Sequence, residues 1–129
     1  NNTIEGNGGD GLQVIANDSA RVEGLTIQGN TIQGNNSRGI DLHANGATAF
    51  IEASNTIGGT SSNTLAGVTN TQGNNILNNL LDGIRAVAEN NGTIQGNILN
   101  NTINGNTGNG VSLIVDEGGT LDFGTLASN

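Results

Sequence analysis

Residues 30–42 read NTIQGNNSRGIDL, and residues 101–113 read NTINGNTGNGVSL. The same pattern occurs four times, and each copy is anchored on one glycine: Gly11, Gly39, Gly83 and Gly110. An Ile precedes each anchor glycine by seven residues, an Asn precedes it by four, and aliphatic residues follow it by one, three and five. A repeat of this length is typical of a solenoid, in which each unit buries its apolar face against the next.

The spacing of the anchor glycines indicates one insertion. Successive glycines are 28, 44 and 27 residues apart, so the second interval exceeds the first by 16 residues (44 − 28). We place the insertion near residues 54–73, SNTIGGTSSNTLAGVTNTQG, because this stretch is rich in Gly, Ser, Thr and Asn, as loops are. It is expected to protrude between the second and third coils.

Within each unit, apolar and polar residues alternate, which is the period of a β-strand. Short strands in such a unit cannot bury an apolar face alone. We therefore expect each strand to pair in parallel with its counterpart in the next unit, about 4.8 Å away. The sequence predicts an all-β, right-handed parallel β-helix of about four coils. Residues 1–129 would form a single domain, an excerpt or a stackable unit of a longer assembly.

The composition argues against several kinds of partner. The chain has three basic and eleven acidic residues, a formal net charge of −8, and no Cys. Phosphate contacts need Lys and Arg, so we expect no nucleic-acid binding. No stretch of the sequence is apolar for long enough to suggest membrane insertion. Disulfides cannot hold the fold.

Three stretches resemble the parallel β-helix repeats of the pectate-lyase-like superfamily: NTIQGN before GI (30–40), NILNN before DGI (75–84) and NTINGN before NGV (101–111). They are most similar to the Asn-rich repeats of large bacterial secreted and surface proteins, and NTIGG followed by NNILNN resembles a recurring element of that group. The resemblance implies the fold and a secreted or cell-surface location in a bacterium. It leaves activity open, because the superfamily includes lyases, hydrolases, epimerases, phage tailspikes and adhesins.

Two sets of Asn recur in register. The first Asn row is Asn30, Asn74 and Asn101, and the second Asn row is Asn7, Asn35, Asn79 and Asn106. We expect their amides to stack and to hydrogen-bond along the axis, as Asn ladders do, and a sugar-binding strip is the weaker alternative. The anchor glycines are expected at corners with positive φ.

Charged residues fall into two columns. The position before the anchor glycine reads Asp10, Arg38, Asp82 and Asn109, and the position two after it reads Gln13, Asp41, Arg85 and Ser112. Opposite charges on neighbouring strands favour pairing. We therefore expect Arg38 to contact both Asp10 and Asp82, and Asp41 to contact Arg85, so that these pairs set the register.

The column four residues after the anchor glycine holds Ile15, His43, Val87 and Ile114. The residues one, three and five after the glycine are expected to point inward, so this column should form an outward aliphatic stripe interrupted by His43, unless a bend or loop covers it. His43 is the only His, and because it is alone, without an acidic or metal partner on its strand, we expect a surface residue.

The acidic residues are scattered. The exception, Asp116-Glu117, precedes two glycines and is typical of a solvated turn. Pectate-type elimination needs calcium held by clustered Asp, and glycoside hydrolysis needs paired carboxylates. The sequence therefore predicts no catalytic, cofactor-binding or metal-binding residue, and no enzyme.

We expect a non-catalytic structural β-helix, either a section of an extracellular surface protein or adhesin, or a fibre-forming subunit. Its partner would be another copy of the chain, joined through the exposed strand edges at the ends of the β-helix. The alternative is a domain that binds or processes polysaccharide, with residues 54–73 walling a groove. Against it, the chain has two Phe and no Tyr or Trp on which a sugar could stack.

Overall fold

A computed structural model describes residues 1–58 and 73–127. All regular structure in these ranges is β-strand, and they contain no helix that could cross a membrane. In chain order the strands are β1 (Thr3–Glu5), β2 (Leu12–Asn17), β3 (Arg21–Val22), β4 (Thr26–Ile27), β5 (Thr31–Gln33), β6 (Ile40–Asn45), β7 (Phe50–Gly58), β8 (Asn75–Leu77), β9 (Ile84–Glu89), β10 (Thr93–Leu99), β11 (Thr102–Asn104), β12 (Val111–Val115) and β13 (Thr120–Ala127).

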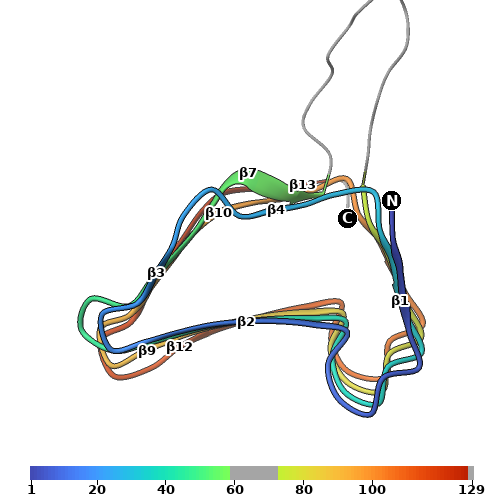
Figure 1. Ribbon diagram of the computed structural model, residues 1–129, viewed down its shortest axis with the longest axis horizontal. Coiled ribbons are helices and arrows are strands. Elements are labelled where there is room, and N and C mark those ends of the chain that lie inside the picture. Colours follow the sequence, from blue (N-terminus) through green and yellow to red (C-terminus); the bar gives the residue numbers. More distant parts are fainter. Residues whose placement is uncertain (59–72, 128–129) are drawn as a thin grey trace, which may run out of the picture.

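The strands form three parallel sheets, and the chain visits them in the same order each time. The sheet orders are β1-β5-β8-β11, β2-β6-β9-β12 and β3-β7-β10-β13, and β4 also pairs with β7. We call β1–β4 the first pass, β5–β7 the second, β8–β10 the third and β11–β13 the fourth. In Figure 1 the four passes overlie one another around a shared three-sided outline.

The strand register confirms the repeat alignment. Ile32 of β5 lies between Ile4 and Ile76, and Ile103 follows in β11. The backbone N–H of each of the first three anchor glycines donates to the carbonyl of the residue before the next one, as Gly39 does to Asp82 at 3.0 Å. The 44-residue interval between Gly39 and Gly83 therefore leaves the stacking of the passes unbroken.

The apolar columns form one core between the three sheets. The largest fully buried apolar side chains are Ile32, Ile40, Leu42, Ile51, Ile57, Ile76, Ile84, Ile94 and Ile98, all from the second and third passes. The equivalent residues of the outer passes, such as Ile4 and Ile103, are partly buried against this core. The two middle passes are thus covered on both sides, and the outer passes on one.

The reason expected for the anchor glycines is wrong. None of the four has positive φ. At Gly11, Gly39 and Gly83 the next pass lies too close for a side chain: a Cβ added to Gly39 would sit 2.5 Å from Ile76 Cγ2 and 2.6 Å from the carbonyl oxygen of Gly83. Positive φ occurs instead one residue before the second Asn row, at Gly6, Gly34, Asn78 and Gly105.

The predicted insertion is shorter than residues 54–73. Strand β7 continues to Gly58, and Ile57 pairs with Ile27 on one side and Ile98 on the other. Residues 54–58 therefore belong to the second pass, and residues 59–72 of the predicted loop lie outside the described ranges. Asp116 and Glu117 occupy an exposed turn, as predicted.

Candidate functional site: polar rows along the stacked strands

The first Asn row is a continuous line of hydrogen bonds between passes. Asn30 donates from its backbone N–H and from Nδ2 to Oδ1 of Asn74, at 3.1 and 3.2 Å. Asn74 donates in the same way to Asn101, and Asn2 to Asn30, so Asn2 extends the row into the first pass. Asn74 and Asn101 are buried. The amides thus join one pass to the next inside the fold.

The second Asn row follows the same rule, and in both rows a buried Nδ2 also donates to a backbone carbonyl, as Asn74 does to Ile27 at 2.9 Å. Oδ1 of Asn79 accepts from the backbone N–H and Nδ2 of Asn35, at 3.2 and 2.9 Å. Nδ2 of Asn79 donates to Oδ1 of Asn106 at 2.8 Å and to the carbonyl of Ile32 at 3.3 Å. Asn79 is fully buried, so these bonds satisfy polar atoms that water cannot reach. The prediction of stacked amides is confirmed.

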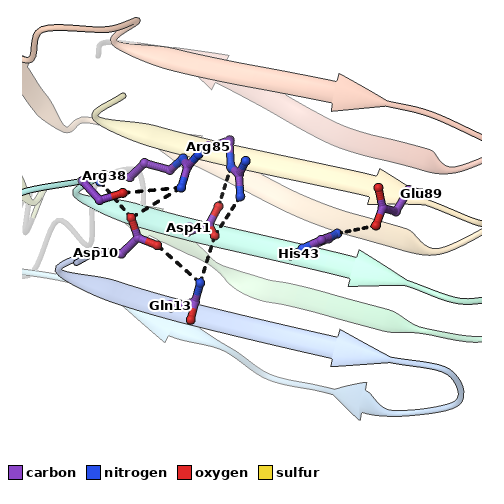
Figure 2. A network of polar contacts seen from close by, with 8 residues as sticks. Asp10, Gln13, Arg38, Asp41, His43, Arg85 and Glu89 are labelled. Carbon is purple, nitrogen blue, oxygen red and sulfur yellow. Dashed lines mark hydrogen bonds and ion pairs between the residues drawn. The ribbon is translucent and has the colours of Figure 1, made fainter. Parts of the chain in front are cut away.

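A charged network lies on the β2–β6–β9–β12 sheet (Figure 2). Asp41 of β6 receives two hydrogen bonds from Arg85 of β9, Nε to Oδ1 at 2.7 Å and Nη2 to Oδ2 at 3.0 Å. Gln13 of β2 donates to Oδ2 of Asp41 at 3.3 Å, and also to Asp10. Only 1% of Asp41 is exposed, so one carboxylate joins three consecutive passes in a nearly buried position.

Asp41 is held in its ionised form. Burial raises the pKa of Asp41, but the hydrogen bonds from Arg85 and Gln13 and the positive charges of Arg85 and Arg38 outweigh burial and keep the pKa below its ordinary value. The hydrogen bond to Asp41 in turn raises the pKa of Arg85. A buried, ionised carboxylate with both oxygens occupied is poorly suited to exchange protons with a substrate.

Of the two contacts predicted for Arg38, with Asp10 and with Asp82, one is present. Arg38 Nη1 lies 3.6 Å from Oδ1 of Asp10, and the same oxygen accepts the Arg38 backbone N–H at 2.8 Å. No ion pair joins Arg38 to Asp82 in the described ranges. Asp82 instead accepts the backbone N–H of Asn109 at 2.7 Å, so it binds the pass that follows it. Each Asp of this column thus binds the backbone of the next pass, which the charge pattern did not indicate.

His43 has an acidic partner on the neighbouring strand β9, which was not predicted. Its Nε2 lies 2.9 Å from Oε1 of Glu89. Val87 is the direct strand partner of His43, and Glu89 lies two residues further along β9, so alignment of the repeats position by position did not bring the pair together. The pair could have been found by comparing each residue also with the residue two positions further along the adjacent strand, its diagonal neighbour.

The outward aliphatic stripe is interrupted at two positions, not one. Of the two alternatives, exposed or covered, Ile15 and Ile114 follow the first, at 46% and 41% exposed, whereas Val87 is only 6% exposed. Both exposed members lie on the outermost strands of the sheet, β2 and β12, whereas Val87 has a strand on each side.

A surface hollow of about 590 Å³ lies elsewhere, lined by Glu5, Gly6, Gln33, Gly34 and Asn78. Two of its lining residues bind each other: Gln33 Nε2 donates to Oε2 of Glu5 at 2.8 Å. None of the residues labelled in Figure 2 lines this hollow. In the described ranges, no three His, Cys, Asp or Glu side chains are grouped so that they could hold a metal ion.

Comparison of the chain with protein-family models, with curated proteins and with solved structures gives no match. The chemistry that the described residues offer is therefore read from their geometry. The polar side chains of these rows bind the neighbouring passes and hold them in register.

Proposed function

We propose that the chain is a right-handed parallel β-helix whose role is structural and non-catalytic, as a rigid section of an extracellular surface protein or adhesin, or as a subunit of a fibre. The observation that carries this proposal is the second Asn row. Its four amides bond one pass to the next, and the buried members, Asn35 and Asn79, find their hydrogen-bond partners in the neighbouring passes.

The charged residues support the same role. Asp41 and Arg85, the pair that would be first suspected of catalysis, hydrogen-bond each other, and Asp41 is buried. An Asp and an Arg that bind each other across two passes resist a slip between these passes, because a slip would separate the pair. A shift of one residue would also turn the apolar columns outward. We therefore assign this pair to register rather than to chemistry.

A second candidate is polysaccharide binding at the hollow. Glu5, Gln33 and Asn78 present carboxylate and amide groups to an open volume of about 590 Å³, which could accept sugar hydroxyls. The scarcity of aromatic side chains argues against tight binding there.

Incubation with pectin and with alginate, with and without calcium, separates these functions. We expect no unsaturated product by ultraviolet absorbance and no change in the thermal midpoint. Product formation that Asp41→Ala or Arg85→Ala abolishes, in a variant that still folds, would overturn the structural role. A rise in the midpoint that Glu5→Gln removes would support glycan binding at the hollow instead.

A further inference from the structure

The fourth pass has the surface features of a pass that carries another on top of it. At Gly83, an added Cβ would lie 2.6 Å from Ile103 Cγ2 and 2.7 Å from the carbonyl oxygen of Gly110, because the fourth pass covers it. At Gly110, the single described atom within 4 Å is Ile103 Cγ2 at 3.6 Å, an ordinary contact. Gly110 also lacks positive φ. Nothing in the described chain therefore requires glycine at residue 110.

We propose that the fourth pass binds the first pass of a second copy of this chain, in the register that the internal passes use. This inference rests on the proposed structural role and names its partner. In that register, Ile4, Asn7 and Gly11 of the second copy would stand over Gly110, as Ile103, Asn106 and Gly110 stand over Gly83. A glycine would then be needed at residue 110 for the same reason as at the other anchors.

The second Asn row has the polarity for this contact. Each Asn donates from its backbone N–H and Nδ2 to Oδ1 of the next pass, as Asn7 does to Asn35 at 3.1 and 2.8 Å. No described residue donates to Oδ1 of Asn7. The second copy would bring this oxygen to Asn106, whose equivalent, Asn79, donates both groups to the pass above it. The acceptor end of the row thus meets the donor end.

Four of the seven exposed large apolar side chains in the described ranges lie on the fourth pass, Ile15 lies on the first, and the other two, Leu80 and Leu81, lie on the third. Leu113, Val115 and Leu126 of the fourth pass are exposed, although their partners one pass earlier, Ala86, Ala88 and Ile98, are fully buried. On the outward stripe, Ile114 would become the neighbour of Ile15 of the second copy. Copies that stack in one direction would cover these side chains and leave the same surface open on the next copy, which generates a filament.

Charge opposes this association without forbidding it. Each copy carries a net charge of −8, so added salt should promote stacking. In this register Asn104 would face Glu5 and Ser112 would face Gln13, whereas Asp122 would face Glu23 and add to the repulsion. The amide–carboxylate pair resembles the internal bond between Gln33 and Glu5.

The test uses Gly110→Ala, with Gly83→Ala as the matched control. Sedimentation and negative-stain electron microscopy of the unaltered chain, over a range of protein and salt concentrations, should show filaments with a repeat of about 19 Å per copy, four passes of about 4.8 Å. Gly110→Ala should keep the thermal midpoint of the dilute monomer and raise the critical concentration for filaments about tenfold or more. Gly83→Ala should lower the midpoint of the monomer itself.

Polarity gives a second readout. A Gly110→Ala chain keeps an intact first pass, so small amounts of it should bind the growing end of unaltered filaments and shorten them. An unaltered chain that stays monomeric at every salt concentration would overturn the inference, and so would filaments that Gly110→Ala leaves unaffected. Either result would leave the structural role standing if the Asn and Asp41 variants described below still lose stability.

Discussion

Replacing Asn79 by Leu tests the second Asn row where it is most buried. The substitution removes the acceptor for two donors of Asn35, and it removes the donor to Asn106 and to the carbonyl of Ile32. A buried group left unsatisfied costs about 1–3 kcal/mol, and the two Asn35 donors alone therefore cost about 2–6 kcal/mol. Against a total of about 5–15 kcal/mol for a domain, a loss of this size is large.

The assay is urea unfolding followed by circular dichroism, because the chain has no Trp or Tyr for fluorescence. Asn75→Ala is the matched control: Asn75 lies in the adjacent strand β8 but is exposed, and we expect a change within about 0.5 kcal/mol. The reasoning would be refuted if Asn79→Leu lowered the free energy of unfolding by no more than Asn75→Ala does.

Three further predictions follow from the same contacts. Arg85→Ala should cost about 3–5 kcal/mol in urea unfolding because it leaves the buried Asp41 carboxylate without its charge partner, and a loss below 1 kcal/mol would show that the pair does not hold the passes. The folded pKa of Asp41 lies below its ordinary value of 3.8, so the contribution of Asp41 to stability should be complete above about pH 4 and be lost as the pH falls through the lower folded pKa. Acid unfolding of the Asp41→Asn variant should lack this loss of stability. Gly39→Ala should cost about 1–3 kcal/mol from overpacking, whereas Gly8→Ala, whose Cβ would meet nothing within 4 Å, should be neutral; equal effects would contradict the close approach of the passes at Gly39.

Much of the architecture could be predicted from residue spacing alone. The equivalence of Ile4, Ile32, Ile76 and Ile103 follows from counting, and strand pairing follows from that equivalence because parallel strands place identical positions side by side. The Asn rows and the Asp41–Arg85 pair were predicted for the same reason: each is a direct neighbour along a column.

Contacts that cross columns could not be read in this way. The bond between His43 and Glu89 is diagonal. Arg38 lies between two Asp residues of equal charge and turns toward Asp10, not Asp82, and this choice depends on side-chain orientation. The anchor glycines were assigned to the right positions for the wrong reason, since both a positive φ and a close neighbouring pass require the same residue type.

Cysteine pairing across the long interval tests most directly whether the repeats stack in register. Thr31 of β5 and Asn75 of β8 are direct partners, although the insertion lies between them, and Thr3 is the partner of Thr31 on its other side. The chain has no Cys of its own. Neighbouring strands place Cα atoms about 4.8 Å apart, within disulfide range, whereas Thr3 and Asn75 lie two strands apart at about 10 Å, beyond it. Under mild oxidation, the Thr31→Cys/Asn75→Cys variant should lose both free thiols within one molecule and Thr3→Cys/Asn75→Cys should keep them. The opposite result would contradict the stacking on which every other conclusion depends.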